Sequence, residues 1–269
     1  MKRVNGIPIL GFGTYPLSSD EADRAIATAL ELGFRHVDTA QMYGNEAEVG
    51  RALERSGIAR GDLYIVTKVD PGNIGADRFV ASVERSIAHL GGPVDLLLIH
   101  WPPPDKHFDR AVDLLIEAKD RGFTKSIGVS NFTIAMMQRA QKRAGNALIA
   151  NQVEFHPLID QSRVREEAER LGMTLMAYCP LGRGEVMKSK VIQEIGYKLK
   201  RPASEVALAW ILQQNVVAIP MTTKRENAAS NLRALDLVLS QADMDAITQV
   251  SKGNRRLISP SGWAPKWDS

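Results

Sequence analysis

Residues 94–100 read VDLLLIH, a stretch that is apolar almost throughout instead of alternating between apolar and polar side chains. A run of this kind is typical of a parallel strand that helices cover on both faces. Shorter apolar runs lie in HVDTA at 36–40 and LYIVTK at 63–68, and segments with helical spacing separate the three. The sequence therefore predicts right-handed βαβ units around a parallel sheet.

The same alternation continues along the rest of the chain. From ILGFGT at 9–14 to VVAIP at 216–220 it gives eight strands, with no Pro- or Ser-rich linker between them. Chains of this length commonly form one α/β barrel. We predict that residues 1–269 form a single domain of the α/β class, a (β/α)8 TIM barrel.

Both ends of the chain lie outside this repeat. Asn5-Gly6 predicts the turn of an N-terminal β-hairpin, because this pair favours two-residue turns. The tail after about residue 255 has no periodicity and carries Trp263 and Trp267. We predict that this C-terminal tail lies over the barrel mouth, and the alternative is a frayed terminus.

The composition excludes several classes of partner. The chain has 34 basic and 31 acidic residues, a net charge of +3, and no basic block, which does not fit a nucleic-acid-binding protein. It has no apolar run of membrane length and no signal-peptide core. Cys179 is the single cysteine, and no two histidines have ligand spacing. We therefore predict a cytosolic protein with neither disulfide nor metal site.

Four reactive side chains follow the predicted strands at or near their C-terminal ends: Asp38, Tyr43, Lys68 and His100. In a parallel barrel these strand ends meet at one face. A Tyr with a pKa of about 10 is a poor acid alone, but a nearby cation favours its phenolate, and a carboxylate keeps that cation in place. The set suits protonation of a carbonyl oxygen while a nucleophile such as hydride reaches the carbon. Taken singly, each residue has a structural alternative: an Asp that ends a strand is often a helix cap, and a Tyr after it is often packing. A Lys that ends an apolar strand is harder to explain in this way, because an unpaired buried charge is costly.

Seven motifs together resemble the aldo-keto reductase family. They occur in the family's order and spacing over nearly the whole chain. The motifs are HVDTAQMYGNEAEVG at 36–50, TK at 67–68, LLLIHWP at 96–102, IGVSNF at 127–132, NQVEFHP at 151–157, YCPLGRG at 178–184 and TKRENAASNL at 223–232. The last motif and the ending RLISPSGWAPKWD resemble the bacterial branch that reduces 2,5-diketo-D-gluconate and small ketoaldehydes.

The resemblance implies a monomeric barrel enzyme that uses NADPH and reduces small aldehydes and ketones, such as ketoaldehydes and keto-sugar acids, to alcohols. Tyr43 would donate the proton to the carbonyl oxygen. Lys68, paired with Asp38, would lower the pKa of the phenol. His100 would hydrogen-bond the carbonyl and orient it beside the nicotinamide, and such preorganised donors usually supply a large share of catalysis.

The resemblance also implies a set of cofactor-binding residues. Ser130, Asn131 and Gln152 match the groups that bind the nicotinamide carboxamide, and Tyr178 matches the aromatic ring that stacks on the nicotinamide. Leu181 and Gly182 match a loop that passes over the pyrophosphate. The full set is Thr14, Ser130, Asn131, Gln152, Tyr178, Pro180, Leu181, Gly182, Thr222, Thr223, Lys224, Arg225, Asn227 and Asn231.

The 2′-phosphate site departs from the family pattern. Many members have Lys directly after the Pro of the last strand and Arg six residues later, where this chain has Met221 and Asn227. Residues 222–225 still place two hydroxyls and two cations before a predicted helix, and Thr223 with Glu226 predicts a capping box. A helix N-terminus of this kind suits an anion, so we expect NADP(H); the alternative is a solvated helix start without a phosphate.

For substrate contact we expect Tyr15, Met42 and Trp101, each beside a strand end or one of the four reactive residues. Tyr15 stands where many relatives have Trp. The segment between His100 and Ser126 is compact and the tail is short, which gives the hypothesis of a shallow site for small, polar carbonyl compounds.

Two other functions fit parts of this pattern. A barrel that binds NADPH as a redox sensor would not need an activated phenol, so the presence of all four reactive residues argues against it. A lyase or isomerase could use Lys68 to form a Schiff base. Asp38 would keep that amine charged and therefore poorly nucleophilic.

Overall fold

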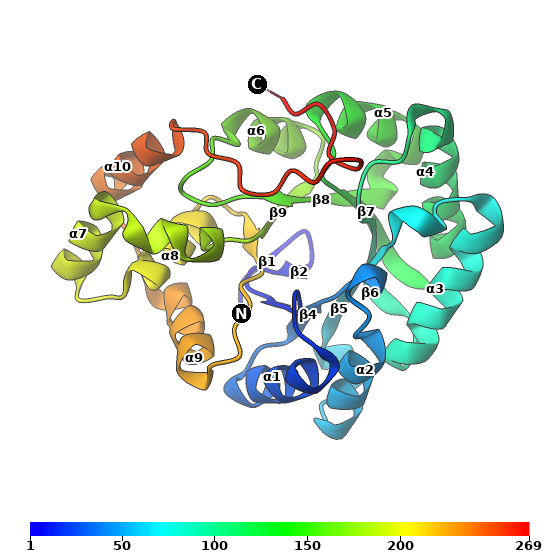
Figure 1. The fold of residues 1–269 in the computed structure, drawn as a ribbon, viewed down its shortest axis with the longest axis horizontal. Helices are drawn as coiled ribbons and strands as arrows, with labels where there is room; N and C mark the ends of the chain where they lie inside the picture. The colour runs from blue at the N-terminus through cyan, green and yellow to red at the C-terminus, as the bar shows by residue number, and fades with distance from the viewer. Residues whose placement is uncertain (269) are drawn as a thin grey trace.

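A closed ring of eight parallel strands forms the centre of the molecule, and helices surround it (Figure 1). The structure, a computed structural model, describes residues 1–268, apart from the side chains of residues 76 and 77. The strands of the ring are β3 (Phe12–Gly13), β4 (His36–Asp38), β5 (Tyr64–Val69), β6 (Val94–Ile99), β7 (Thr124–Ser130), β8 (Leu148–Glu154), β9 (Thr174–Tyr178) and β10 (Val217–Ala218). They follow one another in chain order around the sheet. The predicted βαβ alternation and eight-strand count are confirmed.

The first and last strands close the ring through backbone hydrogen bonds. Leu10 forms a parallel bridge with Ala218. The amide of Gly11 donates to Ala218 O at 2.8 Å, and the amide of Ala218 donates to Ile9 O at 2.9 Å. Closure leaves no free sheet edge, and because the strands are parallel their C-terminal ends all meet at one mouth.

The helices form an outer layer, with short 3-10 turns between them. Their bounds are α1 (Ser19–Leu32), α2 (Glu46–Arg55), α3 (Ala76–Leu90), α4 (Asp105–Asp120), α5 (Ile134–Ala144), α6 (Ser162–Arg170), α7 (Lys190–Leu199), α8 (Ala203–Gln213), α9 (Arg225–Arg233) and α10 (Gln241–Ser251). Two short turns matter for the site, η1 (Gln41–Tyr43) and η5 (Gly182–Lys188). Within residues 1–268 none of the helices is long and apolar enough to cross a membrane.

Helix α4 begins directly after a proline. Pro104 occupies the N-cap position of α4, so the helix starts at Asp105. Proline tolerates a helix start because its missing N–H is not needed there. Helix α10 was not predicted.

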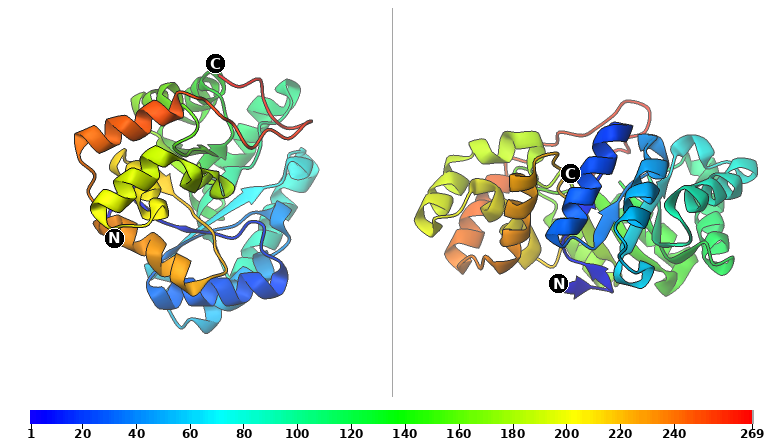
Figure 2. Two further views of the ribbon diagram at one scale, coloured as in Figure 1. Left: turned by 60° about the vertical axis from the view of Figure 1, so that its left-hand side comes forward. Right: turned by 90° about the horizontal axis from the view of Figure 1, so that it is seen from below.

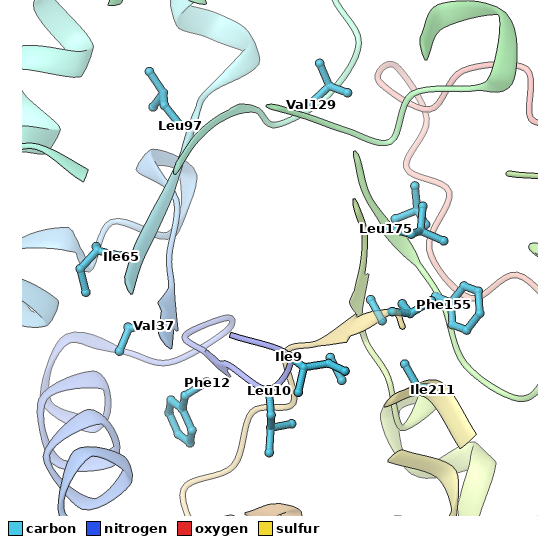
Figure 3. Close-up of a cluster of buried hydrophobic side chains, with 14 of the residues drawn as sticks. Ile9, Leu10, Phe12, Val37, Ile65, Leu97, Val129, Phe155, Leu175 and Ile211 are labelled. Carbon is cyan, nitrogen blue, oxygen red and sulfur yellow. The ribbon is translucent and has the colours of Figure 1, made fainter. Parts of the chain in front are cut away.

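Side chains alternate between two apolar cores along each strand. Val37, Ile65 and Leu97 point outward against the helices, as Figure 3 shows. Val66 and Leu98 point into the barrel, with neighbours from the other strands. Because this alternation has a period of two, it also determines which polar side chains at the strand ends face the mouth.

The two ends of the chain cover opposite ends of the barrel (Figure 2, right). The hairpin of β1 (Arg3–Val4) and β2 (Ile7–Pro8) turns at Asn5-Gly6 as predicted, and Ile7 fills the bottom of the inner core. The tail after α10 crosses the other end, past the C-terminal ends of the strands. The predicted position of the tail over the mouth is confirmed, since Trp267 contacts Trp101 beside β6.

Candidate active site

Asp38 and Lys68 form a buried ion pair at the mouth. Asp38 ends β4 and Lys68 lies near the end of β5, both with the inward orientation of Val66. Lys68 Nζ lies 2.5 Å from Asp38 Oδ1 and donates to Thr39 O at 2.9 Å. The side chains are only 1% and 2% exposed. A buried ammonium without partners would be costly, so this pairing accounts for a Lys inside the barrel.

Tyr43 and His100 complete the group, which we call the tetrad: Asp38, Tyr43, Lys68 and His100. Turn η1 brings the Tyr43 hydroxyl to 3.5 Å from Lys68 Nζ. His100 directly follows β6, and its ring meets the Tyr43 ring edge to face at 5.5 Å between centroids. The structure therefore brings all four sequence-predicted residues together.

Burial and charge set the protonation of the tetrad. Burial raises the pKa of Tyr43, and the charge of Lys68 lowers it only in part. The expected effect of Lys68 on the phenol is therefore present, but burial outweighs it. Burial lowers the pKa of Lys68, but the charges of Asp38 and Tyr43 and the hydrogen bonds to both together more than offset this, so the net pKa is raised. Burial and the Lys68 charge hold the pKa of His100 well below its usual value.

These shifts define one protonation state near neutral pH. Tyr43 is a neutral phenol, Lys68 a cation and His100 a neutral imidazole. Nδ1 of His100 is buried without a hydrogen-bond partner among residues 1–268. Nε2 is not one of the buried atoms that lack a partner. The mouth therefore offers a substrate oxygen two neutral hydrogen-bond donors beside a fixed positive charge.

Three residues that support Tyr43 from its own sequence motif, HVDTAQMYGNEAEVG, were not predicted from the sequence. Gln41 accepts from the amide of Asp70 at 3.0 Å and donates to Ser86 at 3.1 Å, which fixes η1 against β5 and α3. Glu46 accepts from Thr67 Oγ1 at 2.6 Å. Asn45 binds the carbonyls of the loop after β3. Their polarity directly around Tyr43 in HVDTAQMYGNE was the only available signal, because their partners come from other strands and helices.

The residues expected at the carboxamide form one hydrogen-bonded group. Ser130 Oγ donates to Gln152 O at 2.8 Å, and Asn131 Nδ2 donates to Ser130 Oγ at 3.1 Å. The Tyr178 hydroxyl donates to Asn131 Oδ1 at 2.8 Å. Gln152 Nε2 donates to Asp38 Oδ2 at 2.8 Å. This last bond joins the group to the tetrad.

Two polar atoms in this region fit the carboxamide of a nicotinamide. Thr14 Oγ1 is buried without a hydrogen-bond partner in the described part of the chain. Gln152 Oε1 likewise accepts no hydrogen bond from residues 1–268, while its Nε2 is used by Asp38. An amide ligand can supply both a donor and an acceptor, so the residues present fit this part of the cofactor.

The loop after β9 contains Pro180, Leu181 and Gly182. Gly182 has a φ of +55°, and a Cβ there would lie 2.9 Å from Val186 Cγ2. Both the backbone conformation and this neighbour therefore favour glycine. The loop leads into η5 beside the mouth, where a compact backbone turn can approach a ligand.

The start of α9 differs from its prediction. The expected capping box of Thr223 and Glu226 does not form, because the helix begins at Arg225 with Lys224 in the N-cap position. Thr222 replaces it: its Oγ1 accepts from the Lys224 amide at 3.1 Å. Such a local bond from a threonine side chain to a nearby backbone amide competes with helix capping.

The remaining residues of the expected phosphate site are loosely held. Asn227 Nδ2 donates to Thr222 Oγ1 at 3.4 Å, and Arg225 pairs with Glu31 at 2.7 Å on the surface. Asn231 is buried, and its side chain has no partner within residues 1–268. These groups suit an anion, but they do not form a rigid cluster.

Of the expected substrate residues, two contact the tetrad. The Tyr15 ring lies 5.1 Å from the Tyr43 ring, and Trp101 stacks on His100 at 6.5 Å. Met42 is half-buried in η1 next to Tyr43. All three therefore lie around the mouth.

Comparisons with known proteins agree with this geometry. The profile of the Aldo/keto reductase family matches residues 9–252. The chain is 42% identical over 266 residues to methylglyoxal reductase DkgB of Salmonella typhi, covering 97% of this chain and 99% of the relative. It is 38% identical over 263 residues to an aldo-keto reductase of Mycobacterium marinum, covering 97% and 93%.

Solved structures are similar over the same length. A crystal structure provisionally named 2,5-diketo-D-gluconic acid reductase B has a TM-score of 0.96 and 41% identity, covering 99% of this chain and 96% of that one. A mutant of Gox0644 in complex with NADPH has a TM-score of 0.88 and 33% identity, covering 94% and 93%.

The fold and the grouped strand-end residues define a barrel oxidoreductase. The chain belongs to the aldo/keto reductase family. It is an NADPH-dependent oxidoreductase that reduces carbonyl groups. In the described part of the chain, no group of three or more His, Cys, Asp or Glu side chains could hold a metal ion.

Proposed function

We propose that the protein reduces small ketoaldehydes and keto-sugar acids to alcohols, with Tyr43 as the proton donor. The observation that carries this proposal is the Tyr43 hydroxyl 3.5 Å from a buried, Asp38-paired Lys68. The names of the methylglyoxal and 2,5-diketo-D-gluconic acid reductases support this substrate class.

In the proposed reaction, Tyr43 and His100 both donate hydrogen bonds to the carbonyl oxygen. Bound NADPH supplies a hydride to the carbonyl carbon. Tyr43 then transfers its proton to the oxygen, so the carbonyl becomes an alcohol and solvent returns a proton to the phenol. Lys68 stabilises the phenolate character that develops on Tyr43, and its positive charge is more effective at this buried site than in water.

The chain's own residues would orient the cofactor at two places. Thr14 and Gln152 would bind the carboxamide, and the Tyr178 ring would cover one face of the nicotinamide. Tyr178 is held by its bond to Asn131, so its position does not depend on a ligand. Thr222, Lys224 and Arg225 would bind the 2′-phosphate through hydroxyl and cationic groups.

The rim of the mouth supports this substrate class. Trp101 is 6% exposed and Tyr15 is 53% exposed, so aromatic surface borders the tetrad on two sides. The tail brings Trp267 to 6.3 Å from Trp101. Such a rim suits a short carbonyl compound that lies flat against it, and we expect little turnover of bulky steroid ketones.

The test is a stopped-flow and steady-state assay with NADPH and NADH on methylglyoxal, nitrobenzaldehyde and 2,5-diketo-D-gluconate, in wild type and Tyr43→Phe. General acid catalysis contributes about 10²–10⁴ in rate, so Tyr43→Phe should lose at least about a hundredfold in kcat and keep its NADPH affinity. Near-normal turnover by the variant would remove Tyr43 from this role. NADPH binding by wild type without oxidation by any of the carbonyls would favour a cofactor sensor instead.

We further propose that residues 1–269 act as one domain, as a monomer in the cytosol. A single Cys179 and the use of NADPH support this location. One cooperative unfolding transition and a sedimenting mass of 29.6 kDa are expected. A second transition or a dimer mass would contradict the proposal.

A further inference from the structure

Glu154, a fully buried residue that the proposed reaction does not use, ends strand β8. The amide of Leu257 donates to its Oε1 at 2.7 Å, and the amide of Ile258 donates to its Oε2 at 2.9 Å. His156 Nε2 lies 2.9 Å from Oε1. An environment made of donors fits the ionised carboxylate, which only accepts.

The neighbouring bonds of His156 determine its tautomer. The amide of Leu158 donates to His156 Nδ1 at 3.2 Å, so Nδ1 is the acceptor of the ring. Nε2 therefore carries the proton and donates to Glu154. The carboxylate thus receives three hydrogen bonds, two of them from a segment 103 and 104 residues away in sequence.

A continuous series of contacts leads from this carboxylate to the tetrad. Arg256 Nη1 lies 3.7 Å from Glu154 Oε2, and the Arg256 guanidinium lies over the Trp267 ring at 3.8 Å from its centroid. Trp267 packs edge-on against Trp101, and Trp101 stacks on His100. The position of residues 256–258 therefore determines where the aromatic rim lies.

Other contacts hold the tail at each side of this segment. The Arg255 amide donates to Leu158 O at 2.7 Å, and Asp268 accepts from the Ile134 amide at 2.9 Å. Neither contact involves Glu154, so both should remain when Glu154 is changed. Loss of the carboxylate would therefore loosen the middle of the tail without releasing the tail.

We infer that Glu154 is a positioning residue for the carbonyl substrate. By binding the amides of Leu257 and Ile258 it determines where the tail crosses the mouth, and so where Trp267 and Trp101 border the site. The inference rests on the proposed function, because it requires the substrate to lie against Trp101. It predicts an effect of Glu154 on KM that is separate from kcat.

The test variant is Glu154→Gln, which keeps the size of the side chain but turns an NH₂ toward groups that are themselves donors. The KM for methylglyoxal should rise about fivefold, the scale of one lost aromatic contact, while kcat stays within about twofold. Amide hydrogen exchange at Leu257 and Ile258 should be slow in wild type and fast in the variant. The amide of Arg256, which has no partner within residues 1–268, serves as the fast reference.

A matched control is available on helix α8. Glu205 is also fully buried and accepts from Ser230 at 2.7 Å and from Arg233 at 2.9 Å. Neither of these bonds involves the tail. Glu205→Gln should therefore lower the Tm as Glu154→Gln does, but leave KM unchanged.

A second variant changes the rim directly, at Trp267, in case Glu154→Gln does not fold. Trp267→Leu removes the ring that Arg256 and Trp101 contact, together with its hydrogen bond to Ser259, and its KM should rise by a similar factor. When both substitutions are combined, KM should rise no more than in the single variant with the larger rise. Both substitutions act through the same contact of Trp267 with Trp101.

The outcomes separate the inference from the proposed function. A Glu154→Gln protein with rapid exchange at 257 and 258 but an unchanged KM would overturn the inference and leave the proposed function intact. Slow exchange in the variant would show that the carboxylate does not hold the tail, which also overturns it. A wild type that exchanges slowly at both amides but reduces no carbonyl would overturn the proposed function, and with it the role in substrate positioning.

Discussion

The tetrad and the loop that begins α9 are both charged sites at the mouth, yet they are built in opposite ways. In the tetrad, Asp38 is bound by both Lys68 and Gln152, and its exposure is 2%. In the loop, Arg225 is 57% exposed and has Glu31 as its ion-pair partner. Removal of one partner from a buried ion pair leaves the other charge buried and unpaired, whereas an exposed charge contributes in small, graded steps.

The largest effect should come from Lys68→Met. A unit charge 3.5 Å from the phenol oxygen is worth about 5 kcal/mol at an effective dielectric constant of about 20, so kcat should fall at least about a thousandfold. The buried Asp38 would also lose its partner, which should cost about 3–5 kcal/mol of unfolding free energy. Single-turnover rates well below the Tm, together with denaturant unfolding, measure the two effects separately.

Lys125→Met is the matched control for this change. Lys125 pairs with Asp95 at 2.8 Å but is 64% exposed. Pairs of this kind contribute about 0–1 kcal/mol, so both kcat and unfolding should stay near wild type. A loss of less than about tenfold in Lys68→Met would mean that the charge of Lys68 does not act on Tyr43.

A smaller effect is expected from Arg225→Met in the exposed loop. One exposed charge-assisted contact with a 2′-phosphate is worth about 1 kcal/mol, so the Kd for NADPH should rise about fivefold. The Kd for NADH, which lacks that phosphate, should not change. Titration of protein fluorescence with each cofactor measures both constants, and an equal loss for the two would place Arg225 away from the phosphate.

Glu31→Gln should act in the opposite direction on the same group. Arg225 is now shared between Glu31 and any bound anion, so removal of the carboxylate frees it. The expected gain is about twofold in NADPH affinity, the scale of an exposed ion pair. Weaker NADPH binding in this variant would mean that Glu31 orients Arg225 instead of competing for it.

The same difference between buried and exposed sites explains what the sequence could predict. Asp38, Lys68 and His100 could be predicted because they recur together at the ends of successive apolar strands, even though a single one can have a structural explanation. Their inward orientation follows from the alternation that places Val66 and Leu98 inside the barrel. Strand-end position and periodicity were therefore sufficient to predict that these side chains meet at the mouth, whereas their roles were implied by the family resemblance.

Other parts of the site depend on partners that are distant in sequence. Glu154 is an ordinary residue of NQVEFHP until the fold brings Leu257 and Ile258 to it. At the start of α9, Thr223 and Glu226 match a capping box, yet the competing turn at Thr222 forms instead. Single-sequence patterns do not rank such local alternatives, since they differ by only about 1 kcal/mol.

The smallest effect should be that of pH on the reduction itself. Tyr43 must be protonated to act as the acid, and because its pKa lies above the ordinary value it stays protonated as the pH rises. His100 must be neutral, and because its pKa lies well below the ordinary value it stays neutral as the pH falls toward neutrality. The kcat for reduction should therefore change less than about twofold between pH ~7 and ~9. The reverse oxidation needs the phenolate, so its rate should rise with pH over the same interval. A bell-shaped reduction profile centred near neutral pH would show that the buried phenol is far more acidic in the working complex than its surroundings in the protein imply. The contrast between the buried tetrad and the exposed loop would then lose its electrostatic basis.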